Sequence, residues 1–322
     1  MKTRLIPAVV LTLGAAATAL TACSVDSAPA DSGSEAGTVT VGTLRAQPHL
    51  YTPSFYEDFS DDIDFEIVLF DTSTDIKNAI VSGSIDFGVT GAASVVSGVA
   101  QGEGVTIVAS SADGGTRIVA AEHVGSVEDL AGATIGYPMG ATQEILLKRT
   151  LEANGIDPAE DVELVNLPFS DMAGALSSGQ VDAFISAEVG PSIAIEAGAH
   201  ELLSAYDTPI LRTNIVLATS TSLIGSDPEL VQAVVDTHIA ATDHMAANTD
   251  EWADGLVADY SLDASVVATA IENIWPRWQL DDEWLAGLDA MNTEMLEFGQ
   301  ISQAADPEAL VTTTFVDAAA GS

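Results

Sequence analysis

The sequence has little cysteine, little positive charge and few aromatic residues. Its one cysteine excludes an internal disulfide, an iron–sulfur cluster and a cysteine-based zinc site. Nine basic residues stand against 48 acidic ones, and the formal charge of −39 repels phosphate backbones, which excludes nucleic acid as a partner. The five histidines are scattered, so we expect no metal and no cofactor. Apolar residues still make up 47% of the chain, which excludes a wholly disordered protein.

Signatures of catalysis are also missing. The chain has no G-x-S-x-G elbow, no G-x-x-x-x-G-K-[ST] phosphate loop and no complete G-x-G-x-x-G motif. An enzyme would have only Glu188, His49 or Asp71 to offer as an acid, base or nucleophile in a cleft. We therefore expect a binding protein, with an enzyme as the alternative.

Residues 1–22 have the pattern of a lipoprotein signal peptide. Lys2 and Arg4 precede an apolar stretch that begins at Ile6 and is too short to cross a membrane comfortably. The stretch ends in the motif Leu-Thr-Ala-Cys at residues 20–23, which resembles a bacterial lipobox. We expect Cys23 to be lipidated and to become the first residue of the mature protein. An ordinary signal peptide followed by an incidental cysteine is the other interpretation.

The segment after Cys23 is predicted to be a tether. Residues 23–37 are rich in Ser, Ala, Asp and Gly, a composition typical of flexible linkers. Cleavage before Cys23 would leave seven basic and 48 acidic residues, a net charge of −41. No second apolar run of about 18 residues follows. Lipid alone would therefore hold the mature chain on the outer side of the bacterial cell membrane.

From Thr38 onward, short β-branched runs alternate with helical patterns, which is typical of an α/β fold. Predicted strands cover residues 38–44, 64–70, 85–89, 105–110, 134–137, 162–167, 181–186 and 215–219. Predicted helices cover residues 75–82, 92–100, 142–154 and 171–178, and residues 227–298 are expected to be almost wholly helical. The blocks 38–110 and 134–186 share one β-α-β-α-β layout. This repetition favours two α/β lobes with a ligand cleft between them and a C-terminal helical segment.

Three turns that lead from a strand into a helix are built of small or hydroxyl-bearing residues. They lie at residues 70–74, 88–93 and 136–142. Each would present free backbone N–H groups and the positive end of a helix dipole, and small residues would let a ligand approach closely. Ordinary strand–helix connections have the same composition, so the turns alone do not decide between a site and a scaffold.

Three motifs in the α/β part of the chain occur in a fixed order. They are S-G-S-I-D-F-G at residues 82–88, S-V-E-D-L-A-G-A-T-I-G-Y-P at 126–138 and L-S-S-G-Q-V-D-A-F at 176–184. In this order and at these separations they resemble the extracytoplasmic solute-binding proteins of ABC importers for nitrate, sulfonate, taurine and related molecules. That family also includes binders of thiamine precursors. The resemblance extends from Thr38 to about Pro228.

The resemblance implies a type II periplasmic binding protein fold that works as a monomer and delivers its ligand to an ABC permease. Lobe one would comprise residues 38–116 and 213–322, and lobe two residues 117–212, joined by two crossovers that allow closure on the ligand. Arg117 and Arg212 lie near these crossovers, where either a hinge salt bridge or a ligand contact would suit them. The family's frequent Trp-Glu-Pro is replaced by S-A-E-V-G-P at residues 186–191, which keeps Glu188 but lacks the aromatic lid.

We expect the ligand-binding residues at the strand ends and helix starts that face the cleft. They are Arg45, His49, Thr72, Ser73, Gly91, Ala92, Tyr137, Met139, Ala141, Thr142, Glu188 and Asn214. A small anion such as a sulfonate or nitrate would bind the helix N-termini after residues 73, 91 and 140, with Arg45 supplying a positive charge. A neutral thiamine-precursor-like pyrimidine would instead need stacking aromatics and a carboxylate such as Glu188 to accept its ring amines. The low aromatic content near these turns favours the anion.

Overall fold

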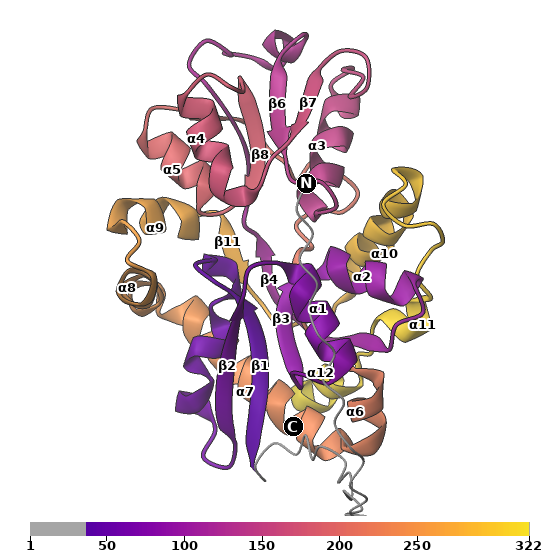
Figure 1. Cartoon of the computed structure of the whole chain (residues 1–322). Helices are drawn as coiled ribbons and strands as arrows, with labels where there is room; N and C mark the ends of the chain where they lie inside the picture. Colours follow the sequence, from indigo (N-terminus) through magenta and orange to yellow (C-terminus); the bar gives the residue numbers. More distant parts are fainter. Residues whose placement is uncertain (1–36, 322) are drawn as a thin grey trace, which may run out of the picture. The chain divides into compact units, whose positions relative to one another are not determined.

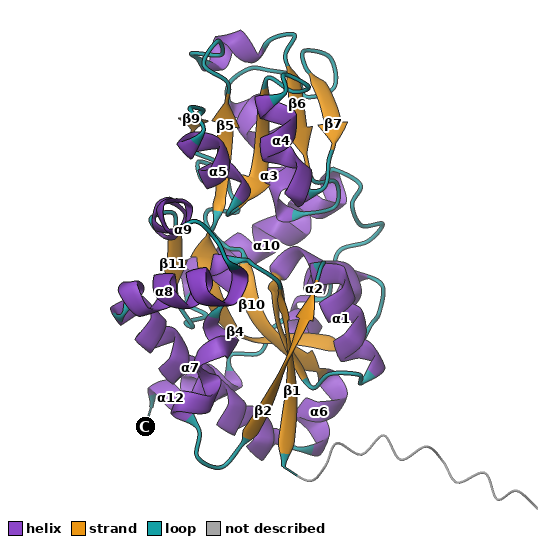
Figure 2. Cartoon of the chain, turned by 60° about the vertical axis from the view of Figure 1, so that its left-hand side comes forward, coloured by secondary structure: helices purple, strands orange, loops and turns teal. Residues whose placement is uncertain are grey.

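The computed structural model describes residues 37–321 (Figure 1). The predicted signal peptide, Cys23 and all of the predicted tether except Gly37 lie outside the described residues. The described strands form two sheets, and helices pack around each of them (Figure 2). Within the described residues, no helix combines the length and the apolar character needed to cross a membrane.

The first sheet is built from both ends of the described chain. Its six strands have the spatial order β11 (Ile274–Pro276), β4 (Val105–Gly114), β10 (Ile215–Ser220), β3 (Phe87–Gly91), β1 (Thr38–Leu44) and β2 (Asp64–Phe70). Strand β1 pairs in parallel with β2 and β3, whereas β10 runs antiparallel to β3 and β4. The carboxyl ends of β1, β2 and β3 therefore meet at one edge of the sheet. Strands β3 and β4 are buried along nearly their whole length because helices cover both faces.

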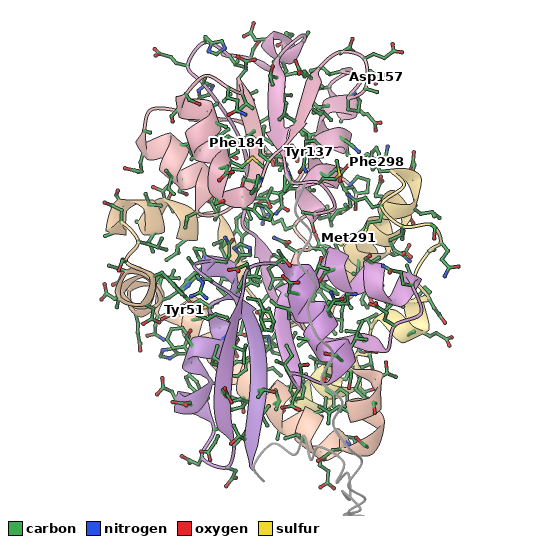
Figure 3. The ribbon with its side chains drawn as sticks, in the orientation of Figure 1. Tyr51, Tyr137, Asp157, Phe184, Met291 and Phe298 are labelled. Carbon is green, nitrogen blue, oxygen red and sulfur yellow. The ribbon has the colours of Figure 1, made fainter. Side chains whose placement is uncertain are left out.

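The second sheet comes from the middle of the chain. Its five strands have the order β7 (Glu163–Asn166), β6 (Thr134–Tyr137), β8 (Ala183–Ala187), β5 (Thr116–Ala120) and β9 (His200–Leu203). Strand β6 is parallel to β7 and β8, and β5 is antiparallel to β8 and β9. Helix α3 (Thr142–Ala153) covers one face, and α4 (Met172–Ser177) and α5 (Gly190–Glu196) cover the other (Figure 1). Phe184 on β8 is fully buried in a small core with Met172 of α4 (Figure 3).

The remaining helices pack mainly on the first sheet. They are α1 (Ser73–Ser82), α2 (Ala92–Ala100), α6 (Thr221–Ser226), α7 (Pro228–Ala247), α8 (Thr249–Tyr260), α9 (Ala264–Ile271), α10 (Asp282–Glu297), α11 (Pro307–Leu310) and α12 (Thr314–Ala320). Short 3₁₀ segments occupy η1 (Pro48–Leu50), η2 (Thr52–Phe59), η3 (Val127–Leu130) and η4 (Phe169–Asp171). Helix α7 begins where Asp227 accepts from the Leu230 N–H, with proline at the first helical position.

The chain passes between the two sheets twice. Strand β4 ends at Gly114 and β5 begins at Thr116, while residues 204–214 return the chain from β9 to β10. Gly114 and Gly115 both have a positive φ, at 78° and 73°. A Cβ at Gly114 would lie 2.5 Å from the Trp275 ring, and one at Gly115 would lie 3.0 Å from the His49 ring. Glycine is therefore required at this crossover both for its backbone angle and for its lack of a side chain.

The α/β pattern predicted from the sequence is confirmed, but three strands were not predicted. The predicted lobe boundaries stay a prediction, since the described residues group into one compact unit. Strands β5 and β9, which pair with each other, were missed although they are no shorter than the predicted strands β3 and β6, respectively. The expectation of an almost wholly helical segment at 227–298 is wrong at Ile274–Pro276, where β11 pairs with the edge of β4. A three-residue strand that ends in proline has no alternation to detect, and its partner lies about 160 residues away along the chain.

Candidate functional site

The starts of helices α1 and α2 lie side by side at the carboxyl edge of the first sheet. The Thr72 hydroxyl caps α1 by accepting from the Asp75 N–H at 3.1 Å. The Ser73 hydroxyl accepts from the Gly91 N–H at 3.2 Å, and the Ser73 carbonyl accepts from Thr90 Oγ1 at 3.2 Å. Since Gly91 is the N-cap of α2, the predicted binding residues of these two turns are directly joined.

Asn214 connects the same edge to the crossover. Its carbonyl accepts from the Ala92 N–H at 2.7 Å, and its side-chain amide donates to the Gly114 carbonyl at 2.6 Å. Both Asn214 and Ala92 are buried. The structure thus brings Asn214 to the predicted site, with its amide nitrogen already bonded within the protein.

Arg45 lies beside the turn that starts α1. Its N–H donates to the Phe70 carbonyl at 3.1 Å, and its Nε lies 3.9 Å from Asp71 Oδ1. The two side chains are 58% and 88% exposed, so water screens their attraction and the ion pair is weak. The guanidinium is therefore free to turn toward an incoming anion.

His49 lies at the crossover and is buried. Its ring packs against Gly115, and its Nδ1 has no hydrogen-bond partner in the described part of the chain. Burial lowers the pKa of His49 to about 3, so the ring is neutral at physiological pH. His49 can therefore contribute a neutral polar contact but not a positive charge.

The turn at the end of β6 is less open than the sequence predicts. Tyr137 is buried at the end of β6 (Figure 3), Ala141 is half-buried and Thr142 is buried, whereas Met139 is 63% exposed. The Met139 N–H donates to Asn166 Oδ1 at 3.0 Å. The expectation of free N–H groups is therefore wrong at Met139, as it is at Gly91 and Ala92, whose N–H groups donate to Ser73 and Asn214.

The first turn of α3 already holds a carboxylate. The Gly140 N–H donates to Glu144 Oε2 at 2.7 Å, and Gln300 Nε2 donates to the same oxygen at 2.8 Å. Burial opposes ionisation of Glu144, but Gly140, Lys148 and Gln300 together hold the pKa of its carboxyl below the usual value. A glutamate at the third helical position often reaches back in this way, so the sequence did contain the signal. An anionic ligand at this helix start would meet a negative charge.

Glu188 is fully buried at the end of β8 and is bonded within the protein. Its Oε2 accepts from the Ser192 N–H at 3.2 Å and the Ser192 hydroxyl at 2.7 Å, and its Oε1 lies 3.2 Å from Arg117 Nε. Burial raises the pKa of Glu188, while Ser192 and Arg117 oppose the shift. Arg117 also lies 3.6 Å from Glu201 and donates to the Thr269 carbonyl at 3.1 Å. Of the two roles predicted for Arg117, a hinge salt bridge and a ligand contact, the structure shows the salt bridge.

Residues that the sequence did not single out gather around Thr116, the first residue of β5. Gln143 of α3 donates to Thr116 Oγ1 at 2.9 Å, and the Tyr206 hydroxyl donates to the Thr116 carbonyl at 2.8 Å. Asn273 donates to the same carbonyl at 3.0 Å. These contacts join segments that lie far apart in the chain, so no local pattern reveals them.

The residues named for an enzyme do not form a shared arrangement. No hydrogen bond or ion pair joins Glu188, His49 and Asp71 to one another in the described chain. Among residues 37–321, no group of three or more histidine, cysteine or acidic side chains is placed to hold a metal ion. The arrangement supports noncovalent binding at the edge formed by Ser73 and Gly91.

Comparison with known proteins assigns residues 55–252 to the family model described as NMT1/THI5 like. A presumed binding protein of Brucella abortus (strain 2308) is 24% identical over 243 residues, which cover 71% of this chain and 75% of the relative.

Solved structures share the fold. The periplasmic aliphatic sulphonate binding protein SsuA of Escherichia coli matches with a TM-score of 0.76 at 19% identity, over 87% of this chain and 93% of that one. The periplasmic nitrate-binding protein NrtA of Synechocystis PCC 6803 matches with a TM-score of 0.71 at 13% identity, over 88% of each chain. A ligand-binding component of an ABC-type import system from Staphylococcus aureus has a TM-score of 0.75 at 16% identity and covers 87% of this chain and 98% of that one. The fold is thus that of the periplasmic binding proteins.

Proposed function

Because the chain belongs to the NMT1/THI5-like family, we propose that it is an extracytoplasmic solute-binding protein that delivers a small molecule to an ABC importer. The resemblance seen in the sequence motifs is confirmed at the level of the family. The structural neighbours include proteins that bind sulfonate and nitrate and a component of an import system, which supports this role. The ligand would bind between the two sheets and leave unchanged, without an enzymatic step.

The observation that carries the proposal is the junction of Ser73 with Gly91 at the starts of α1 and α2. Helix α2 has no acidic residue in its first turn, whereas α1 has Asp75 and α3 has Glu144. The α2 dipole therefore meets no acidic side chain in its first turn, which favours a negative charge there, although the Gly91 and Ala92 N–H groups already donate to Ser73 and Asn214. Arg45, weakly paired and largely exposed, would add a full positive charge to a small anion bound there. These features favour a small organic or inorganic anion such as a sulfonate or nitrate.

The neutral pyrimidine has less support. It would need Glu188 to accept ring amines, but that carboxylate is already bonded to Ser192 and Arg117 and is fully buried. It would also need an aromatic ring to stack on. The Tyr51 ring packs against Phe55 and Tyr260, and its hydroxyl donates to Asp259 at 2.7 Å. Tyr51 is therefore already packed within the protein and does not offer a free ring for a ligand to stack on.

Thermal melting with a panel of compounds tests the ligand class. Alkyl and aryl sulfonates, nitrate, carboxylates and pyrimidines are each added to the purified protein, and the anions are expected to raise the melting temperature. A ligand at one hundred times its Kd stabilises the fold by about 2.7 kcal/mol. Arg45→Ala should weaken binding of the best anion about tenfold, since it removes a charge-assisted contact.

Gln180→Glu is the matched control for Arg45→Ala. Gln180 is exposed in the turn before β8, and its substitution makes the net charge more negative by the same amount. If Gln180→Glu weakens the anion as much as Arg45→Ala does, the effect is one of overall charge. Stabilisation by neutral compounds alone, or unchanged anion binding by Arg45→Ala, would contradict the proposed ligand class.

We further propose that Cys23 carries the lipid that holds the protein on the outer side of the cell membrane. The lipobox-like motif at residues 20–23 and the polar segment after it support this role. Cys23→Ala should move the protein from the membrane fraction to the soluble or unprocessed fraction, which fractionation and immunoblotting would detect. Ser27→Ala, in the same segment, should remain with the membrane. Full membrane retention of Cys23→Ala at the size of the processed wild-type protein would contradict lipid anchoring.

A further inference from the structure

A pocket of ≈ 460 Å³ lies at the crossover, and no residue from the starts of α1 and α2 lines it. Its walls come from the end of β4, the 204–214 return segment, the residue after β11 and the start of α10. The lining residues are Asp113, Ser204, Tyr206, Asp207, Leu211, Arg212, Thr213, Arg277, Glu283 and Trp284. In the strand order β11-β4-β10-β3-β1, the pocket lies at β4, whereas Ser73 and Gly91 lie beyond β10 at β3. The pocket shares no lining residue with that edge, although Asn214, whose carbonyl accepts from the Ala92 N–H, directly follows the lining residue Thr213.

Arg212 in this pocket differs from the other basic residues of the described chain. Each of the others lies within 4.0 Å of at least one carboxylate; they are Arg45, Lys77, Arg117, Lys148, Arg149 and Arg277. Arg212 forms no ion pair with any residue from 37 to 321, although the chain carries 48 acidic residues.

The guanidinium of Arg212 is nevertheless held in place. It lies 4.0 Å from the centre of the Trp275 ring and 5.8 Å from that of Tyr206. Stacking of this kind orients the plane of the guanidinium and leaves its N–H edge available. Since Arg212 is also exposed, a ligand in the pocket can reach that edge. A planar carboxylate matches it with two parallel hydrogen bonds.

Two carboxylates of the same pocket are also without a cation. Asp207 and Glu283 are exposed and form no ion pair within the described residues, whereas Asp113 lies 3.0 Å from Arg277. The uncompensated charges of the lining are therefore one guanidinium and two carboxylates. A simple anion would be repelled by Asp207 and Glu283, and a simple cation by Arg212. A molecule with both charges satisfies the two sets together.

We propose that this pocket binds a small amino acid-like zwitterion, with its carboxylate on Arg212 and its ammonium group facing Asp207 and Glu283. The volume falls within the range of small-molecule sites. Because the walls come from the return segment and from the first sheet, an occupied pocket holds these parts of the crossover together. The site is independent of the anion site proposed above, and either can exist without the other.

Tryptophan fluorescence of the purified full chain provides the test. Trp284 lines the pocket and Trp275 stacks with Arg212, so two of the four tryptophans report on its occupation. The probes are the twenty common L-amino acids, with acetate and methylammonium as half-molecules. At least one amino acid should give a saturable signal, and neither acetate nor methylammonium should do so at the same concentration. Arg212→Gln should raise the Kd about tenfold or more.

Three variants make the result decisive. Arg212→Lys keeps the charge but loses the planar N–H edge, so it should bind more weakly than wild type and more tightly than Arg212→Gln. Asp207→Asn with Glu283→Gln should abolish the preference for an amino acid over acetate. Gln180→Glu, which matches the charge change of Arg212→Gln, should bind as wild type does. Melting curves of each variant establish that it is folded.

Several outcomes would overturn the proposal. One is that no amino acid gives a saturable signal, and another is that acetate alone binds as tightly as the best amino acid. A third is that Arg212→Gln binds the amino acid normally while Ser73→Ala loses it, which would place the amino acid at the other site. If no anion raises the melting temperature, the proposed anion site is wrong, but the proposal for this pocket still stands. The two proposals can therefore fail separately.

Discussion

Asp113 shows how burial acts on a single side chain at the crossover. It lies at the end of β4 and pairs with Arg277 Nη1 at 3.0 Å. Burial raises the pKa of Asp113 to about 6, and the Arg277 guanidinium only partly opposes the shift. The pair is thus an ion pair above this pH and a neutral acid beside an arginine below it.

We expect Asp113→Asn to remove part of the pH dependence of stability. The folded-state pKa of about 6 lies above the unfolded value of 3.8, so the folded protein binds this proton more tightly. Asp113 therefore makes the free energy of unfolding fall as the pH rises from about 4 to about 6, by about 2–3 kcal/mol in all. Urea denaturation of wild type and Asp113→Asn across this pH range gives the difference between their free energies of unfolding. The buried histidines are present in both proteins, so their contribution cancels in this difference. A difference that stays constant with pH would contradict the shift.

At the scale of elements, the link between β4 and β5 depends on glycine. The Gly114 carbonyl accepts a hydrogen bond from the Asn214 side-chain amide, and the Gly114 N–H donates to the Arg212 carbonyl at 2.9 Å. Its left-handed backbone and its contact with the Trp275 ring leave no space for a side chain. The strand end, the return segment and β11 all meet at this residue, so a change there affects the joint between the sheets.

Gly114→Ala should destabilise the fold more than an alanine at another left-handed glycine. Gly102 is the matched control, because its φ of 79° is close to the 78° of Gly114 but a Cβ there would meet no atom within 4 Å. In both variants the left-handed backbone of the alanine lowers the free energy of unfolding by about 1 kcal/mol. In Gly114→Ala the new Cβ also clashes with the Trp275 ring and the Asn273 carbonyl, so the free energy of unfolding falls by about 3 kcal/mol in all. Chemical denaturation measures both. Equal losses would show that the contact with Trp275 relaxes freely.

At the scale of the whole molecule, a cluster of charges joins α3 of the second sheet to α10. Arg149 forms ion pairs with Glu294 and Glu297 of α10, and its guanidinium lies 4.6 Å from the centre of the Phe298 ring. Gln300 reaches Glu144 of α3 at 2.8 Å. Rotation of the sheets about the crossovers would have to break these contacts, so they favour the arrangement seen here.

We expect Arg149→Gln to shift the ligand-free protein toward a more open arrangement. Losing the contacts to Glu294 and Glu297 removes part of the free energy that holds α3 to α10, while the packing within each sheet is unaffected. Small-angle scattering should give a larger radius of gyration for this variant than for wild type, and a saturating ligand should reduce the difference. Gln180→Glu again matches the charge change and should scatter as wild type does. Identical profiles for all three proteins would contradict a role in closure.

Local sequence was sufficient for the elements whose pattern lies within one segment. Residues 134–137 and 92–100 were predicted with the boundaries that β6 and α2 have, because β-branched runs and a stretch of small helical residues are local signals. The turns at Ser73 and Gly91 were likewise found from their composition. The family was evident from three motifs in order, each contained in fewer than fifteen residues.

Contacts between distant segments decided the rest, because no local pattern records which side chains meet in space. The ion pair of Glu188 with Arg117 was not evident from the sequence, and the α3 helix start was expected to be open and is occupied by Glu144. The three missed strands exist only through pairing with partners from elsewhere in the chain. Arg212 had the same two interpretations as Arg117, a salt bridge or a ligand contact. Only the folded chain shows which carboxylates come within reach: Glu188 lies 3.2 Å from Arg117, whereas no carboxylate of residues 37–321 forms an ion pair with Arg212.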